Sequence, residues 1–375
     1  MITMRILYFS KNYSSHDYRF LVKMVESRNE IFFITLESKD LHYGIRNIPI
    51  GVKIITGLKE RSESDNPEKL FSLLPSFEKI INTISPDIIH AGPVQSCGFL
   101  TALIDFHPFI LMSWGSDILV DANKNELLNW ITRFTLMKSD RILCDCNAVR
   151  DKIQQIIAYD NEKIIQFPWG VNLKLFKPGS DLLKLKTKYG WENCFVILST
   201  RMWEPLYGID IVLKSFYIAY KTNPKLRLVI LGDGSQAIEI KKFIREHNLE
   251  DIIILPGIIS NDLLADYYRS VDAYISCSFS DGSSVSLLEA MASGLPVIVT
   301  DIPGNREWVI NEKNGCLAAL GNVQDFAAAI INICRKSCAE KQRISNNNRS
   351  IIERKANWEE NILKLYHIYN QFGDD

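Results

Sequence analysis

The sequence lacks several features that would each have pointed to a particular class of protein. No apolar run reaches the roughly 18 residues that indicate a membrane-spanning helix. The 43 basic and 44 acidic side chains give a net charge of −1, so overall basicity gives no reason to expect nucleic-acid binding. The apolar core near the N-terminus, residues 6–9, is too short for a secretory signal. We therefore expect a globular cytoplasmic protein.

The cysteines are not spaced as in a metal-binding site. Cys144 and Cys146 form one close pair and Cys334 and Cys338 another, but neither has a second pair or a histidine at zinc-site spacing. The other four cysteines are single, and two of them lie in apolar, strand-like runs. The pattern predicts reduced, mostly buried thiols, as is usual in the cytosol.

Short apolar segments alternate with helical segments in two successive series. The first series predicts strands at residues 5–10, 31–36, 52–56, 87–90, 109–113 and 141–145, helices at 18–27 and 70–84, and a polar loop at 60–68. The second predicts strands at 195–199, 227–231, 252–255, 273–276 and 296–300, and helices at 209–220, 237–247, 262–270 and 285–292. This alternation predicts an α/β fold with two doubly wound parallel sheets, and 375 residues suit two domains.

The most informative segment begins at Asp281 and continues into the predicted helix at residues 285–292. Gly282 and Ser283 suit a tight turn and an N-cap, and the first helical turn offers unpaired backbone N–H groups to a phosphate. Glu289, about one turn deeper, can accept hydrogen bonds from vicinal hydroxyl groups, as in a ribose. The residues alone leave a second interpretation open, an ordinary βα unit in which Asp281 caps the loop and Glu289 is solvated.

Ligands of open α/β sheets bind beyond the carboxyl ends of the strands. With two such sheets in one chain, the cleft between them is the expected active site.

Further segments carry patterns that occur together in one enzyme family. In chain order these are Pro86-Asp87-Ile88-Ile89-His90, Trp114-Gly115-Ser116-Asp117, Pro168-Trp169-Gly170-Val171-Asn172, Ser199-Thr200-Arg201 followed by Gly208, Pro256-Gly257, the segment from Asp281 to Glu289 followed by Ala290-Met291-Ala292 and Gly294-Leu295-Pro296-Val297, and Pro303-Gly304-Asn305-Arg306-Glu307. Together they resemble the retaining GT-B glycosyltransferases of family 4 (group 1).

The resemblance implies two Rossmann-like domains facing a cleft, with a C-terminal helix that crosses back to the N-domain. The acceptor domain would comprise residues 1–175 and the helix at 356–372, and the nucleotide-sugar donor domain residues 176–355. The implied activity is transfer of a sugar, with retention of configuration, from a UDP- or GDP-linked donor to a saccharide or polyprenyl-linked acceptor. Neither a cofactor nor a metal is implied, and a lipid-linked acceptor would imply peripheral association with the inner membrane face.

The resemblance also implies roles for individual residues. Arg201 would neutralise the donor diphosphate, Asp281 would contact the transferred sugar, and Glu289 would bind the ribose. The remaining donor-side candidates are Tyr207, the backbone of Gly257 and Ile258 for the base, and the N–H groups of Ser283, Ser284, Val285 and Ser286 for the phosphates. The acceptor-side candidates are His16, His90, Ser116 and Asp117. Arg201, Asp281 and His16 are the catalytic candidates.

The chain departs from the family pattern at four places. Asp281 stands where a glutamate is usual, Tyr207 where a lysine is expected, and Trp114 where a histidine is frequent; the first βα loop, residues 11–17, lacks glycines. We interpret these changes as the mark of a subgroup in which the Tyr207 hydroxyl binds a phosphate. Two alternatives stay open: a donor-binding partner subunit without catalysis, and a GT-B relative with other chemistry, such as a nucleotide-sugar epimerase or a phosphorylase.

Overall fold

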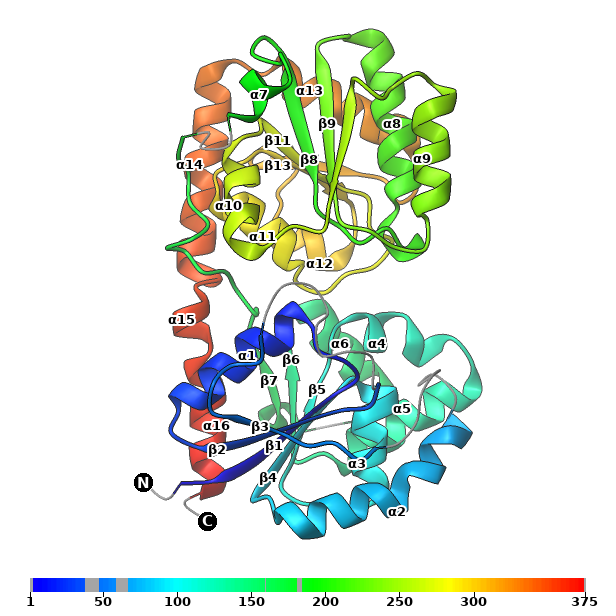
Figure 1. Cartoon of the computed structure of the whole chain (residues 1–375), viewed down its shortest axis with the longest axis vertical. Helices are drawn as coiled ribbons and strands as arrows, with labels where there is room; N and C mark the ends of the chain where they lie inside the picture. Colours follow the sequence, from blue (N-terminus) through cyan, green and yellow to red (C-terminus); the bar gives the residue numbers. More distant parts are fainter. Residues whose placement is uncertain (1–2, 38–46, 59–66, 159, 181–183, 374–375) are drawn as a thin grey trace. The chain divides into compact units, whose positions relative to one another are not determined.

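The computed structural model describes residues 3–37, 47–58, 67–158, 160–180 and 184–373 of the chain. The chain forms two compact units, one made of Met1–Phe167 and Ile362–Asp375 and the other of Pro168–Asn361 (Figure 1). The loop predicted at residues 60–68 lies outside the described residues, except for its last two positions, where a helix begins.

The boundary between the units lies eight residues before the position expected from the sequence. The reason is that the segment after Phe167 pairs with the second unit. The Val171 N–H donates to the Ala356 carbonyl at 2.7 Å, and the Trp358 N–H donates to the Val171 carbonyl at 3.1 Å. Phe176 is buried in a core of the same unit.

The first unit is built on a parallel sheet, which in the described part of the chain has seven strands in the order β3-β2-β1-β4-β5-β6-β7. These strands are β1 (Arg5–Ser10), β2 (Glu30–Thr35), β3 (Val52–Ile54), β4 (Ile88–Gly92), β5 (Phe109–Met112), β6 (Arg141–Cys144) and β7 (Ile164–Gln166). Its helices and helical turns are α1 (Ser15–Glu26), α2 (Pro67–Ile84), η1 (Val94–Gly98), α3 (Phe99–Leu103), α4 (Ser116–Leu119), η2 (Asp121–Asn123), α5 (Glu126–Lys138), α6 (Asn147–Ile156), η3 (Asn161–Lys163) and α16 (Leu363–Gly373).

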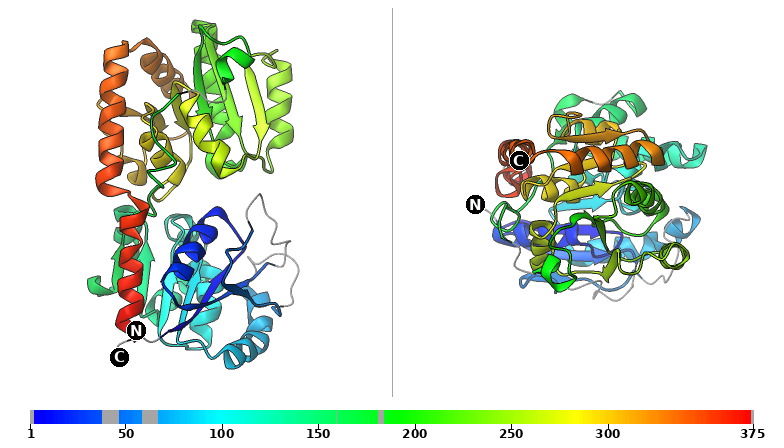
Figure 2. Two further views of the ribbon diagram at one scale, coloured as in Figure 1. Left: turned by 60° about the vertical axis from the view of Figure 1, so that its left-hand side comes forward. Right: turned by 90° about the horizontal axis from the view of Figure 1, so that it is seen from above.

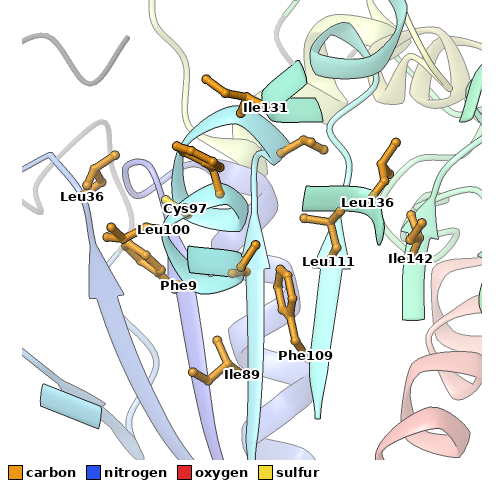
Figure 3. Packing of buried hydrophobic residues seen from close by; sticks show 14 of the residues in the cluster. Phe9, Leu36, Ile89, Cys97, Leu100, Phe109, Leu111, Ile131, Leu136 and Ile142 are labelled. Carbon is orange, nitrogen blue, oxygen red and sulfur yellow. The ribbon is translucent and has the colours of Figure 1, made fainter. Parts of the chain in front are cut away.

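The central strands β1, β4 and β5 are mostly apolar and are buried at every position except Arg5, because helices cover both faces of the sheet. Figure 3 shows one of these faces, where Phe9, Ile89 and Phe109 from neighbouring strands pack with Leu100 and Ile131 from the covering helices. Burial on this scale makes the sheet a rigid support for the loops that follow its strands.

The last helix, α16, belongs to the first unit, as the resemblance implied. Its Tyr369 hydroxyl lies 2.6 Å from Nδ1 of His90, and its Tyr366 hydroxyl donates to the Lys23 carbonyl at 2.7 Å. The helix expected at residues 356–372 is interrupted, because α15 (Trp358–Asn361) ends before α16 begins and stays with the second unit.

The second unit contains, among its described residues, a six-stranded parallel sheet in the order β10-β9-β8-β11-β12-β13. Its strands are β8 (Phe195–Ser199), β9 (Leu226–Leu231), β10 (Ile253–Gly257), β11 (Ala273–Ser276), β12 (Val297–Thr300) and β13 (Gly315–Ala318). Its helices and helical turns are α7 (Leu185–Lys188), η4 (Pro205–Tyr207), α8 (Ile209–Thr222), α9 (Ala237–Glu246), α10 (Asn261–Arg269), α11 (Val285–Ala292), α12 (Pro303–Arg306), α13 (Val323–Arg335), α14 (Cys338–Lys355) and α15.

Two hydrophobic cores sandwich this second sheet. One face packs against α8, α9 and α13, and the other against α10, α11 and α14. Figure 2 shows the long helix α14, drawn in orange, running alongside this unit. All eight cysteines of the chain are free thiols, and five of them are buried, which confirms the prediction made from their spacing.

Candidate active site

The candidate donor site lies at the carboxyl edge of the six-stranded sheet. The strand order reverses direction between β8 and β11, which is where open α/β sheets bind ligands. Arg201 follows β8 and Asp281 follows β11, so the loops that carry them flank this switch point.

Helix α11 begins at the switch point with Ser284 as its N-cap, whereas the sequence pointed to Gly282 or Ser283. The Ser284 side chain makes no capping hydrogen bond. Its hydroxyl instead accepts a hydrogen bond from Nη1 of Arg201 at 2.8 Å. The side chain of Ser284 therefore leaves the first-turn N–H groups of α11 for other partners, as anion binding at a helix N-terminus requires.

Arg201 is the centre of the site. Its Nη1 also donates to the Ser286 hydroxyl at 3.1 Å, and its Nη2 lies 2.8 Å from Oδ2 of Asp281. The guanidinium carbon sits 4.1 Å from the ring centroid of Tyr207, a cation–π contact. The side chains of Arg201 and Asp281 are only 11% and 19% exposed, so the pair is largely screened from water.

Burial and charge act in opposite directions on this ion pair. Burial raises the pKa of the Asp281 carboxyl above its ordinary value, although the Arg201 charge opposes the shift. Burial acts to lower the pKa of Arg201, but the charge of Asp281 outweighs this, and the pKa of the guanidinium rises. Arg201 is therefore permanently charged.

Two tyrosines that the sequence did not single out support the site. The Tyr274 hydroxyl donates to the Ser286 hydroxyl at 2.8 Å. The Tyr268 hydroxyl lies 3.1 Å from the Ser286 carbonyl and 3.2 Å from Oε2 of Glu289, where it orients the carboxylate. Burial raises the pKa of Tyr268 well above its ordinary value, so the phenol stays a donor. In the sequence, both tyrosines look like ordinary core aromatics.

The loop between β8 and α8 explains how Tyr207 reaches Arg201. Trp203 is buried, and its indole N–H donates to the Leu231 carbonyl at 3.0 Å. The Glu204 carboxylate accepts a hydrogen bond from the Ser235 backbone N–H at 2.9 Å. These contacts anchor the residues before η4, and the Tyr207 ring then lies against the guanidinium.

Two glycines shape the rim of the site. Gly257, with φ of +83°, adopts a backbone conformation that L side chains rarely take, and a Cβ there would meet nothing within 4 Å. This leaves open space beside the exposed Ile258, where the base was predicted to bind. A Cβ on Gly304 would lie 2.5 Å from the Gly282 carbonyl oxygen and 2.6 Å from that of Asp281. Only glycine therefore allows α12 to approach the Asp281 loop so closely.

Of the acceptor-side candidates, His16 and Ser116 remain accessible. His16 lies in the first turn of α1, and its ring centroid is 5.4 Å from that of Trp114, which follows β5. Ser116 is the first residue of α4 and is partly exposed. The structure thus brings His16 next to Trp114, one of the positions where the chain departs from the family pattern.

His90 is a correction to the sequence-based prediction. Its side chain is fully buried among Tyr8, Phe20 and Tyr369, and desolvation lowers its pKa to about 3. A neutral histidine enclosed in this way packs the core of the first unit and does not meet an acceptor. All residues of strand β4 are buried, so the place of His90 near the end of this strand did not indicate that its side chain is exposed.

Asp117 is also corrected. Its carboxylate accepts hydrogen bonds from the Ser113 hydroxyl at 2.7 Å and from the backbone N–H groups of Val94, Trp114 and Ile118. Only 3% of the residue is exposed. Asp117 therefore holds the loop between β5 and α4 in shape and does not offer oxygen atoms to a ligand.

Two family models match the chain. The model described as "Glycosyl transferase 4-like" matches residues 5–146, and the model described as "Glycosyl transferases group 1" matches residues 184–351. The two matches fall on the first and the second unit respectively.

Three known proteins illustrate the similarity. The alpha-monoglucosyldiacylglycerol synthase of Streptococcus pneumoniae is 28% identical over 213 residues, which are 55% of this chain and 47% of that protein. The UDP-Gal:alpha-D-GlcNAc-diphosphoundecaprenol alpha-1,3-galactosyltransferase of Escherichia coli is 30% identical over 227 residues, or 56% of this chain and 58% of that protein. Anabaena Alr3699/HepE, solved in complex with UDP and glucose, superposes with a TM-score of 0.79 at 18% identity and covers 98% of this chain and 99% of its own.

Two Rossmann-like domains with parallel sheets place the protein in the GT-B class of fold. Within that class, the chain belongs to the group 1 family of glycosyltransferases, family 4. The matches span only about half of the length of the two curated relatives described above.

Proposed function

We propose that the protein is a retaining glycosyltransferase that moves a sugar from a UDP- or GDP-linked donor to a saccharide or lipid-linked acceptor. The observation that carries the proposal is the position of Arg201, which contacts Ser284 and Ser286 at the start of α11 with Glu289 one turn deeper. An always-charged guanidinium, the N-terminus of a helix and a carboxylate in this order match the phosphates and ribose of a nucleotide.

The donor roles follow from the site geometry. Arg201 and the N–H groups of residues 283–286 would hold the diphosphate, and Glu289, oriented by Tyr268, would accept hydrogen bonds from the ribose. The base would lie in the open space beside Gly257 and Ile258. Asp281 stands at the sugar end of the site, before the helix.

The reaction places developing negative charge on the leaving nucleoside diphosphate. Arg201 and the N-terminus of α11 would stabilise this charge electrostatically, which is the usual dominant contribution in group transfer. We propose that these groups serve in place of a metal ion. The donor phosphate itself would take the proton from the attacking acceptor hydroxyl, so the mechanism requires no side chain as general base.

The acceptor is proposed from the first unit and from the relatives' names. His16 and Ser116 are the accessible polar groups there, and the Trp114 ring beside His16 offers an apolar face to a sugar ring. The names of the two curated relatives mention a diacylglycerol glycolipid and a diphosphoundecaprenol acceptor. We therefore propose that the acceptor is a saccharide or a polyprenyl-linked saccharide used in making a cell-surface polysaccharide or glycolipid.

We also propose that the protein is cytoplasmic and meets lipid-linked acceptors by peripheral association with the inner membrane face. Free, mostly buried cysteines support the compartment. Across the described residues, no helix is both long enough and apolar enough to traverse a bilayer. Sedimentation with vesicles that contain a polyprenyl-linked acceptor tests the association directly.

The test of the activity is a donor screen by mass spectrometry that measures release of nucleoside diphosphate with and without candidate acceptors. We expect release from a UDP- or GDP-sugar that depends on the acceptor. Arg201→Ala should weaken donor binding at least about tenfold. Lys242→Ala, which removes an exposed cation paired with Glu246 on α9, should leave it unchanged. If Arg201→Ala binds the donor like the wild type, the diphosphate assignment is wrong.

One observation favours a second candidate function, a donor-binding partner subunit without catalysis. Arg201 is already neutralised by Asp281, and the usual second cation is replaced by Tyr207. In the same screen, donor binding without turnover on any acceptor would support this alternative, and interconversion of free donor sugars would indicate epimerase chemistry.

A further inference from the structure

In the proposed donor site, the two charged groups nearest the phosphate position are paired with each other. Asp281 Oδ2 lies 2.8 Å from Nη2 of Arg201, and both side chains are largely buried. A diphosphate that binds Arg201 has to compete with this carboxylate, because two anions cannot occupy the same edge of the guanidinium.

We propose that Asp281 is the resident counter-ion of Arg201 and that the donor diphosphate displaces it on binding. The displacement releases the Asp281 carboxylate, which then accepts a hydrogen bond from a hydroxyl group of the transferred sugar. This inference rests on the proposed function and adds a second role for Asp281. The residue sets the affinity for the nucleotide and also contacts the sugar.

The contacts of Arg201 show which partner is replaceable. Nη1 is held by two serine hydroxyls, at 2.8 Å and 3.1 Å, and one face of the guanidinium lies against Tyr207. The Nε–H is buried and, among the described residues, has no acceptor. Anions prefer the edge formed by Nε and Nη2, which they bind with two parallel hydrogen bonds. Asp281 uses only the Nη2 half of this edge, and a phosphate would use both.

The places of these residues in the chain also indicate that Asp281 is the replaceable partner of Arg201. Ser284 and Ser286 are fixed at the start of α11, and the Tyr207 ring follows an anchored loop. Asp281 precedes the helix and lies outside every strand and helix. Its carboxylate also has hydrogen bonds with the Gly282 backbone and the Ser284 side chain, so turning away exchanges these local contacts but breaks no element. The side chain is also one methylene shorter than the glutamate usual in the family that the sequence resembles, which holds the carboxylate close to its own loop.

The exchange has a consequence for turnover. When the product nucleoside diphosphate leaves, Asp281 restores the charge balance of Arg201, so the empty site does not hold a buried, uncompensated cation. A buried cation without a counter-ion costs free energy. Rebinding of the product would relieve that cost, so an unpaired Arg201 would favour rebinding. Product release limits the rate of many enzymes, and an internal counter-ion speeds that step.

The decisive measurement is calorimetric binding of UDP and GDP to the full-length wild type and to Asp281→Asn. The substitution keeps the shape of the side chain and removes the competing charge. We expect UDP or GDP to bind to Asp281→Asn about tenfold more tightly than to the wild type, or by ~1.4 kcal/mol. The affinity for uridine or guanosine should be the same in both proteins. In the wild type, a UDP- or GDP-sugar should bind more tightly than UDP or GDP itself. This difference in affinity should be smaller in the variant, because the carboxylate that accepts a hydrogen bond from the sugar hydroxyl is lost.

Two controls and one substitute variant make the outcome specific. Glu246→Gln removes the same charge from the exposed Lys242–Glu246 pair of α9 in the same unit and should leave both affinities unchanged. In an Arg201→Ala background, Asp281→Asn should have no effect on diphosphate binding, because the two changes act on one interaction. If Asp281→Asn is not folded, as judged by thermal unfolding, Asp281→Ser provides the same charge change.

Unchanged or weaker diphosphate binding in folded Asp281→Asn would overturn the counter-ion role while leaving the proposed function intact. Failure of the wild type to bind any nucleoside diphosphate would instead overturn the proposed function.

Discussion

Tyr207 makes a contact that its position in the sequence did not suggest. The sequence suggested that its hydroxyl binds a phosphate in place of a lysine. The structure shows the ring stacked at 4.1 Å from the Arg201 guanidinium, an arrangement that depends on the aromatic face. The ring thus orients a cation instead of supplying one.

This difference predicts contrasting effects of two substitutions at Tyr207. Tyr207→Phe keeps the ring and should bind UDP or GDP like the wild type. Tyr207→Ala loses the stacking and should bind three- to tenfold more weakly, or about 1 kcal/mol, as measured by calorimetry. Strong weakening by Tyr207→Phe would instead restore the hydroxyl–phosphate interpretation.

His90 provides a residue-scale prediction about pH. Its pKa of about 3 in the folded chain is below the ordinary histidine value of 6.5, so the unfolded chain binds the proton more readily. Stability from this residue is therefore fully present above about pH 6.5 and is lost as the pH falls towards 3. We expect the free energy of unfolding to fall with decreasing pH across this window.

His90→Gln isolates the contribution of the histidine. Glutamine can still hydrogen-bond the Tyr369 hydroxyl but does not titrate, so the pH dependence should be shallower, with a cost of about 1 kcal/mol near pH 7.5. Denaturant unfolding at several pH values measures both quantities. Identical pH slopes for the two proteins would show that folding does not lower the pKa of His90.

At the scale of elements, the site depends on loops that stay in place because the strands before them are buried. The carboxyl ends of β8, β10 and β11 bring together three segments that are far apart in the chain. Close packing of α12 beneath the Asp281 loop adds a second restraint, through the glycine at position 304.

Gly304→Ala tests this restraint. The new methyl group would lie about 2.5 Å from a backbone carbonyl oxygen, so the loop or α12 has to move. We expect binding of UDP or GDP to weaken by on the order of tenfold, since small displacements at a site are costly, while circular dichroism shows the fold intact. Wild-type affinity in the variant would mean that the Asp281 loop is not held by α12.

At the scale of the whole molecule, the end of the chain completes the first unit. Helix α16 buries Leu365, Ile368 and Tyr369, and the Tyr369 hydroxyl is the partner of Nδ1 of His90. Each such apolar side chain contributes about 1.5–3 kcal/mol when it is fully buried.

Truncation after Asn361 should therefore destabilise one unit selectively. Hydrogen exchange is expected to accelerate in β1 and β4, which lie beneath α16 in the first unit, and to stay slow in β8 and β11 of the second. Binding of UDP or GDP should persist. Truncation after Gly373 is the matched control, and equal acceleration in both units would show that α16 supports the whole chain.

Much of this architecture was predictable because buried parallel strands are encoded locally. Strands β1, β8 and β11 lie at the predicted residues, and helix α11 has its predicted bounds. Strands β7 and β13 were not predicted, because short strands at the side of a sheet carry little apolar pattern of their own. Helix α14 was missed for a similar reason, since its sequence is strongly polar and only three of its residues are buried.

The sequence by itself determined that two βα series fold into two parallel sheets, and that Asp281 and Glu289 flank the start of a helix. Periodicity and residue spacing are local properties, and they carry this information. Only the tertiary structure decided that Arg201 pairs with Asp281 and stacks on Tyr207, and that His90 and Asp117 are buried. Those contacts depend on which loops meet at the edge of a folded sheet, and no local pattern in the chain records that meeting.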